Sequence, residues 1–410
     1  MTTTSIPGLV VFEHEFSVPL DHDAPDGERI SVFAREVADP EGRDRPFLLF
    51  FQGGPGFEAT RPSGAPTTPE WITRALRDFR VLLLDQRGTG RSSPVGSLAG
   101  MAPEAQSDFL SYFRADAIVA DAEAIRRELD VERWSVLGQS FGGLCATTYL
   151  SSAPEGLREV LITGGLPAVG HEVDEIYRAT AARMLERNRR YYERYPADRE
   201  RVRALARRLE REEVRLPNGD RLSHARVRQL GHPLGMSDGA EAVHAVLEQP
   251  HDSPGFLHDV QDPLGLGRNP LYAVVHEACW ADGTTTRWAA QRTLPGEYER
   301  SPELLTGEVI LPWMFEEMGA LAPLREAAHL LAERAWPRLY DESALRANEV
   351  PVAAAIYADD PYVERVFSEE TAGLIRGLRP WLTSEYDHNA LRVDGERVLG
   401  RLLDLVRGRA

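Results

Sequence analysis

Three short apolar segments in the N-terminal part of the chain each run directly into a polar, glycine-rich segment. The pairs are PFLLFF with QGGPG, RVLLLD with QRGTGRS, and WSVL with GQSFGG. Continuous apolar strands of this kind are typical of a parallel sheet that is covered on both faces. Apolar residues recur at helical spacing over 115–129, and a fourth apolar segment, REVLITGG, follows at 158–165. This alternation of strands and helices predicts an α/β fold with a mostly parallel sheet over residues 1–168.

The pattern changes after residue 168. Residues 169–345 carry few strand signals and several charge-dense helical patterns, such as IYRATAARMLERNRRYYERY, whose charges are typical of solvated helix faces. A strand pattern returns at PVAAAIYADD, followed by a helical pattern, a loop over PWLTSEYDHN and a closing helix. We therefore expect an α/β core formed by 1–168 and 346–410, interrupted by a helical cap domain over 169–345. Residues 8–35 contain short strand patterns separated by a turn, which predicts an antiparallel edge of the same sheet.

Composition and charge narrow the class of protein. The chain has 410 residues and a formal net charge of −17, so its acidic surface repels nucleic acid. No apolar run approaches the roughly 18 residues that a membrane span needs. The N-terminus also lacks the basic start and apolar stretch of a signal peptide. We expect a cytoplasmic protein without nucleic-acid or membrane partners.

Cysteine usage and motifs give no indication of a metal or cofactor. Cys145 and Cys279 are far apart in the sequence and are expected to be reduced, buried thiols, with a single disulfide between them as the alternative. The sequence contains no His-Glu-x-x-His motif and no phosphate-binding glycine loop. We therefore expect chemistry that uses neither a metal ion nor an organic cofactor.

The serine of GQSFGG is the candidate nucleophile. Gly138-Gln139-Ser140-Phe141-Gly142 fits the G-x-S-x-G pattern between a strand and a helix, which is the setting of the nucleophile elbow of α/β-hydrolases. Larger side chains at 138 and 142 would collide with adjacent strands or with the following helix, so the glycines let the Ser140 hydroxyl project into a cleft. The alternative is an ordinary glycine-containing turn between a strand and a helix.

A serine hydroxyl needs a base and an orienting acid before it becomes a useful nucleophile. Elbow enzymes order these groups as Ser, then Asp or Glu, then His. Among the eleven histidines, His388 follows the last predicted strand, whereas His329 lies in a helical pattern and is expected to be a packing residue. The strand that ends in AAIYADD offers Asp359 and Asp360 as the acid. We favour Asp360, because it lies further past the strand end, and leave Asp359 as the alternative.

The tetrahedral intermediate of acyl transfer also needs hydrogen-bond donors for its oxyanion. One candidate is the backbone N–H of Phe141, the residue after the nucleophile. The other is the N–H of Gly54 in QGGPG, a loop whose glycines allow a close approach of backbone to ligand. A tight turn without a catalytic role is the alternative for this loop.

The segments QGGPG, DQRGTGRSSP and GQSFGG resemble those of the proline iminopeptidases, serine peptidases of the α/β-hydrolase fold, in order and separation. YADD and EYDHNALR are similar to the acid and base segments of that family. The resemblance implies hydrolysis of the peptide bond that follows an unblocked N-terminal proline. Two positions differ, since many members have His where Gln52 stands and Trp where Phe141 stands. Asp85 and Arg87 of the second segment are expected to stabilise its loop.

The resemblance also implies that cap glutamates bind the free amine of the substrate. Glu277 in VVHEACW and Glu316 in LPWMFEE lie among apolar and aromatic residues, where an unpaired carboxylate is costly and a cationic partner is favoured. A structural salt bridge or a helix cap is the alternative for each glutamate. Trp280, Trp313 and Phe315 are candidates for the proline pocket, with core packing as the alternative.

Two other functions are compatible with parts of this pattern. An esterase or other acyl hydrolase would use the same Ser140, His388 and Asp360, so the triad does not separate it from a peptidase. A non-catalytic binding protein is disfavoured by the complete Ser, Asp and His set.

Overall fold

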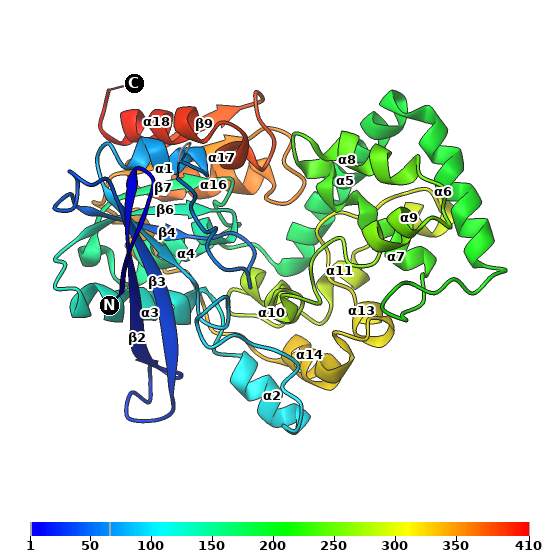
Figure 1. Ribbon diagram of the computed structural model, residues 1–410, viewed down its shortest axis with the longest axis horizontal. Coiled ribbons are helices and arrows are strands. Elements are labelled where there is room, and N and C mark those ends of the chain that lie inside the picture. The colour runs from blue at the N-terminus through cyan, green and yellow to red at the C-terminus, as the bar shows by residue number, and fades with distance from the viewer. Residues whose placement is uncertain (1, 65–66, 410) are drawn as a thin grey trace.

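A nine-stranded sheet forms the centre of the computed structural model, which describes residues 2–64 and 67–409 (Figure 1). Its strand order is β1-β2-β3-β5-β4-β6-β7-β8-β9. The bounds in chain order are β1 (Thr2–Ile6), β2 (Leu9–Pro19), β3 (Arg29–Ala38), β4 (Phe47–Phe51), β5 (Arg80–Leu84), β6 (Trp134–Gln139), β7 (Leu157–Thr163), β8 (Val352–Tyr357) and β9 (Leu378–Thr383). Strands from β5 to β9 along the sheet are parallel, whereas β1, β2 and β3 form an antiparallel edge, with β3 also antiparallel to β5.

Alternate side chains of the central strands enter two hydrophobic cores. In β4, Leu49 packs with the core that contains α3 (Ala115–Glu128) and α4 (Phe141–Ser152). Its neighbour Leu48 packs with the opposite core, which contains α1 (Glu70–Ala75) and α18 (Gly395–Val406). Figure 1 shows α1 and α18 on one face of the sheet and α3 on the other. Burial on both faces explains why these strands are continuously apolar rather than alternating.

Helices and 3₁₀ turns dominate the segment between β7 and β8. They are α5 (Val173–Arg194), α6 (Pro196–Leu209), α7 (His224–Arg228), η2 (Gln229–Gly235), α8 (Gly239–Leu247), α9 (Pro254–Asp259), α10 (Pro270–Val275), η3 (Glu277–Trp280), α11 (Ala289–Arg292), α12 (Glu297–Arg300), α13 (Pro312–Glu317), η4 (Ala322–Leu324), α14 (Arg325–Glu333) and α15 (Glu342–Arg346). Residues from α5 to α9 share a separate hydrophobic core, whereas residues of α10, α13 and α14 belong to the core beneath the sheet. The boundaries at 169 and 345 stay predictions.

The remaining elements complete the two ends of the core. They are α2 (Pro103–Leu110), η1 (Pro154–Gly156), α16 (Arg365–Leu374) and α17 (Ala390–Val393). The expected loop over PWLTSEYDHN is wrong in its first part, because Pro380–Thr383 belong to β9. This strand lies at the sheet edge and most of its side chains are at least partly exposed, so it lacks the buried apolar run of the central strands. Proline is tolerated there because an edge strand has one side without ladder partners. Among the described residues, no helix is long and apolar enough to cross a bilayer.

Candidate active site

Ser140 lies at a sharp turn between β6 and α4. Its backbone has φ 53° and ψ −123°, a conformation that non-glycine residues rarely adopt and that costs about 1–3 kcal/mol. The Ser140 N–H donates to the Thr163 carbonyl at 3.0 Å, and the Ser140 carbonyl accepts from Gly143 N–H at 2.7 Å. These bonds fix the strained residue, so that its side chain projects away from the sheet edge.

The glycines around Ser140 are required by the close approach of other backbone segments. A Cβ atom on Gly138 would lie 2.3 Å from the Gly142 carbonyl oxygen, and one on Gly142 would lie 2.0 Å from the Phe51 carbonyl oxygen. One on Gly143 would lie 2.5 Å from the Gly165 carbonyl oxygen. The sequence GQSFGG is therefore explained by packing between β4, β6 and α4 that has no room for side chains.

The structure brings Ser140, His388 and Asp360 into one hydrogen-bonded set. The Ser140 Oγ and His388 Nε2 atoms are 2.9 Å apart, and His388 Nδ1 and Asp360 Oδ2 are 2.6 Å apart. Asp360 Oδ1 accepts from the backbone N–H groups of Tyr362 and Val363 at 2.9 and 3.2 Å. All three members of the set are buried. This is the arrangement in which an imidazole removes the serine proton and a carboxylate orients the imidazole.

Asp359 binds outside the hydrogen-bonded set of Ser140, His388 and Asp360. Its carboxylate accepts from Arg190 Nη1 at 2.7 Å and is partly exposed. The Arg190 guanidinium beside it holds the pKa of Asp359 below its usual value. Between the two aspartates that the sequence offered, geometry favours Asp360 as the partner of His388.

The environment of His388 favours its protonated form. Burial alone would lower the pKa of His388, but the charge and hydrogen bond of Asp360 outweigh burial and raise that pKa above its usual value. The more distant charges of Glu308 and Asp387 act in the same direction. The ring of Tyr362 packs edge-on against the imidazole, with 4.8 Å between ring centroids. A stabilised imidazolium is what a general base needs once it has accepted a proton.

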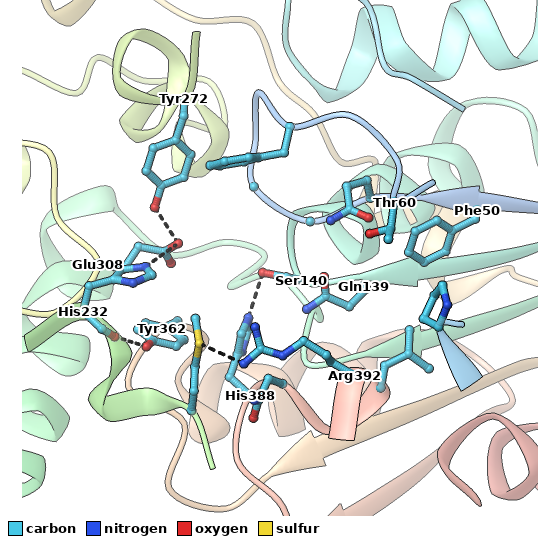
Figure 2. A pocket seen from close by; sticks show the side chains of 18 of the residues that line it. Phe50, Thr60, Gln139, Ser140, His232, Tyr272, Glu308, Tyr362, His388 and Arg392 are labelled. Atoms are coloured by element: carbon cyan, nitrogen blue, oxygen red, sulfur yellow. Dashed lines mark hydrogen bonds and ion pairs between the residues drawn. The ribbon is translucent and has the colours of Figure 1, made fainter. Parts of the chain in front are cut away.

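Ser140 and His388 line a cavity of about 430 Å³ between the sheet edge and the helices that follow β7 (Figure 2). Gly54 lines the same cavity, and a smaller adjoining recess is lined by Gly54, Ser140 and Phe141 together. Phe141 is the first residue of α4, where backbone N–H groups have no intrahelical partner. Gly54 has φ +134°, which suits glycine. The proposed oxyanion role of these two N–H groups stays a prediction.

Glu308 is a cavity residue that the sequence analysis missed. Figure 2 shows it with Tyr272 across the cavity from Ser140, and the Tyr272 hydroxyl donates to its carboxylate at 2.7 Å. His232 Nε2 and His276 Nε2 each lie 3.9 Å from a Glu308 carboxylate oxygen. Burial alone would raise the pKa of Glu308, but the two imidazoles outweigh it and hold that pKa well below its usual value. The Glu308 carboxylate is therefore anionic, and it is partly buried in the cavity wall. Its one sequence signal is a lone acid in the mostly apolar stretch GEVIL.

The two glutamates that the sequence favoured lie elsewhere. The Glu277 carboxylate accepts from the backbone N–H groups of Ala289 and Ala290 at 3.2 and 2.9 Å, so it caps α11. Burial raises the pKa of Glu277. Glu316 is exposed on α13. Neither is among the described residues that line the cavity or the adjoining recess, so the helix-cap alternative describes Glu277.

The three candidate aromatic residues lie in different parts of the structure. Phe315 is fully buried and packs edge-on against Trp288, with 5.8 Å between ring centroids. Trp313 is partly buried against the same hydrophobic core. Neither is found among the described cavity-lining residues, whereas Trp280 lines the recess beside Ser140. Packing therefore accounts for Phe315 and Trp313, and Trp280 is the aromatic candidate that the structure brings to the site.

Asp85 and Arg87 make structural contacts. Arg87 is fully buried and binds the Asp121 carboxylate through two guanidinium nitrogens at 2.6 and 2.7 Å. Asp85 accepts from the backbone N–H groups of Ala59 and Arg91 at 3.2 and 3.0 Å. These bonds tie the loop after β5 to α3 and to the loop after β4, which carries Gly54.

Comparison with known proteins gives the family. The family model for the alpha/beta hydrolase fold matches residues 46–247, in agreement with the fold predicted from the sequence. A proline iminopeptidase of Aeromonas sobria is 46% identical over 419 residues, covering 98% of this chain and 98% of the relative. A proline iminopeptidase of Aspergillus aculeatus is 34% identical, covering 96% of this chain and 93% of the relative. A solved proline iminopeptidase from Mycobacterium smegmatis is 14% identical, with a TM-score of 0.48 over 97% of this chain and 98% of that one. The length and identity of the two sequence matches show that this chain belongs to the proline iminopeptidase family.

Proposed function

We propose that this protein is a serine aminopeptidase that hydrolyses the peptide bond after an unblocked N-terminal proline. The observation that carries the proposal is the juxtaposition of two features in one cavity. One is the hydrogen-bonded set of Ser140, His388 and Asp360, and the other is the partly buried carboxylate of Glu308. The first can cleave an acyl bond, and the second can select a cationic amine. Family membership supports the same substrate class.

Acyl transfer would use each member of the set in turn. His388 Nε2 takes the Ser140 proton while Oγ attacks the carbonyl carbon of the N-terminal proline, and Asp360 holds the imidazolium in place. The tetrahedral intermediate collapses as His388 returns the proton to the leaving peptide nitrogen, which leaves a prolyl ester on Ser140. His388 then deprotonates a water molecule that attacks this ester. The second tetrahedral intermediate collapses as His388 returns the proton to Ser140 Oγ, and free proline is released.

The N–H groups of Gly54 and Phe141 would donate to the oxygen of the tetrahedral intermediate. Both residues line the same recess as Ser140. Gly54 follows the end of β4, and Phe141 begins α4 directly after the β6 turn. Preorganised donors of this kind are worth about 2.7–4 kcal/mol each in related acyl-transfer sites.

Glu308 would bind the protonated secondary amine of the substrate proline. Its carboxylate is fixed by the Tyr272 hydroxyl and lies near the His232 and His276 imidazoles. A charge-assisted hydrogen bond to a partly buried carboxylate is stronger than a neutral one, and a blocked amine would lose it. Trp280 in the adjoining recess would contact the apolar pyrrolidine ring. The cytoplasmic location expected from the sequence remains a prediction.

A comparison of three substrates tests the proposal. Prolyl 2-naphthylamide should be turned over, and its N-acetyl derivative should be hydrolysed at least about 100-fold more slowly, since it cannot form the charged pair with Glu308. A neutral nitrophenyl ester reports the serine chemistry alone. Ser140→Ala should abolish all turnover while the protein stays folded by circular dichroism. High activity on the ester without activity on prolyl 2-naphthylamide would identify an esterase instead.

A further inference from the structure

One face of α5 carries three arginines that bind the loops flanking the catalytic acid and base. Arg183, Arg187 and Arg190 are four and three residues apart, so they project from the same side of the helix. Arg183 donates to both carboxylate oxygens of Glu364 at 2.7 and 2.9 Å. Arg190 donates to the Asp359 carboxylate at 2.7 Å. Both acids belong to the segment between β8 and α16, which also carries Asp360.

Arg187 bridges that segment to the loop of the base. Its Nη2 and Nε atoms donate to the Asp359 carbonyl oxygen at 2.8 and 3.2 Å, and Nη2 also binds the Asp387 carboxylate. Asp359 directly precedes Asp360, and Asp387 directly precedes His388. The Arg187 side chain is 14% exposed. A single guanidinium therefore holds the neighbours of both the acid and the base, which lie in separate loops.

We propose that Arg187 is a positioning residue, which keeps Asp360 and His388 in register with Ser140 and neutralises the Asp387 charge beside the base. The proposal builds on the serine chemistry proposed above but not on the choice of substrate. Arginine suits the position because its planar fork reaches a carbonyl and a carboxylate at once, which the point charge of a lysine cannot reproduce. The cap helix thereby becomes part of the catalytic framework.

The pKa of His388 distinguishes a positioning role of Arg187 from a merely structural one, because a loss of stability alone would not change that pKa. The groups that act on the imidazole by charge or ring contact include Asp360, Asp387, Glu308 and Tyr362. Two further titratable side chains, Arg392 and His232, line the same cavity. Arg187 is bound to Asp387. Removing Arg187 would leave the Asp387 charge without this partner and favour the imidazolium, whereas removing the Asp387 charge would disfavour it. The two changes should therefore shift the pH profile of the base in opposite directions.

The test measures the rate of fluorophosphonate labelling of Ser140 as a function of pH. Labelling requires Ser140 and neutral His388 but no particular substrate, so it stays informative if the peptidase proposal fails. Arg187→Gln should slow labelling at its optimum by about 10-fold or more, because loss of register is costly at a nucleophile. The labelling rate should fall at low pH as His388 becomes protonated, and we call this fall the acid limb. Arg187→Gln should move the midpoint of the acid limb up by about 0.5 pH unit, whereas Asp387→Asn should move it down. The double variant should return the limb toward the wild-type position.

Arg189→Gln is the matched control, because Arg189 lies on the same helix but binds Glu186 and Glu193 on its exposed side. It should label like the wild type. Arg187→Lys should keep the acid limb near its wild-type position, because lysine still supplies a positive charge, but it should not restore the full labelling rate, because lysine lacks the planar fork. If Arg187→Gln does not fold, Asp387→Asn and Arg187→Lys still decide the question. The proposal is overturned if the folded Arg187 and Asp387 variants lower only the melting temperature and leave both rate and acid limb unchanged.

Discussion

Replacing Glu308 by glutamine removes the charge proposed to bind the substrate amine while keeping the size of the side chain. The amide oxygen can still accept from the Tyr272 hydroxyl, which lies 2.7 Å from the carboxylate, so the local packing is preserved. The lost term is the attraction between a carboxylate that is 16% exposed and a substrate ammonium. Loss of one partner of a buried charge pair costs about 2–5 kcal/mol, and the isosteric amide places this change at the lower end.

We therefore expect a loss of about 2–3 kcal/mol in kcat/KM for prolyl 2-naphthylamide, which is roughly 30- to 150-fold. Most of it should be a rise in KM, since the charge pair is already made in the bound ground state. A neutral nitrophenyl ester should change less than about threefold at a pH well above the acid limb. The same variant should move the acid limb to lower pH, because Glu308 is one of the charges that raise the pKa of His388.

The assay is steady-state kinetics on both substrates across the pH range, with Glu277→Gln as the control. Glu277 caps α11 away from the cavity, so this variant should lose thermal stability without a selective rise in KM for the free amine. Equal losses on the amine substrate and the ester in Glu308→Gln would refute the amine-binding role. So would a selective effect in Glu277→Gln and none in Glu308→Gln.

The other predictions concern the base, the acid and the elbow. Because the pKa of His388 is raised above 6.5 and the base must be neutral, kcat/KM should fall as pH drops through a midpoint above 6.5; a midpoint below it would contradict the charge environment described. Asp360→Asn should lower kcat by about 10⁴-fold, as loss of the orienting carboxylate does in other serine triads, whereas Asp359→Asn should stay within about 10-fold of the wild type in the same assay. Gly142→Ala should lower stability by about 3 kcal/mol or more, because its Cβ would lie 2.0 Å from a backbone oxygen. Gly373→Ala in α16, where nothing lies within 4 Å of the added atom, should be neutral or stabilising by up to about 1 kcal/mol in thermal or urea unfolding.

The elbow and the parallel core could be predicted because their constraints are local. Glycines at fixed offsets from Ser140 and uninterrupted apolar strands report backbone crowding and burial directly. The order of the triad then restricted the acid and base to a few late residues. The choice between Asp359 and Asp360 required tertiary structure, since it depends on which carboxylate faces His388 and which faces the arginines of α5.

The cavity wall opposite Ser140 could not be predicted in the same way. Glu277 and Glu308 both lie among apolar residues in the sequence, but one carboxylate satisfies the N–H groups of α11 and the other faces the cavity. Hydropathy does not distinguish a carboxylate that pairs with helix N–H groups from one that faces a cavity. The edge strand β9 was missed for a related reason, because an exposed strand that contains Pro380 carries no burial signal.

The distance along the polypeptide between the proposed nucleophile and the proposed base has a consequence for biosynthesis. Ser140 precedes its hydrogen-bond partner His388 by 248 positions, and Asp360 also follows the helical segment between β7 and β8. A ribosome therefore adds Ser140 and the whole helical segment before it adds Asp360 and His388. Until Asp360 and His388 have been added, the growing polypeptide lacks the carboxylate and imidazole of the hydrogen-bonded set, so we expect it to have no serine hydrolase activity.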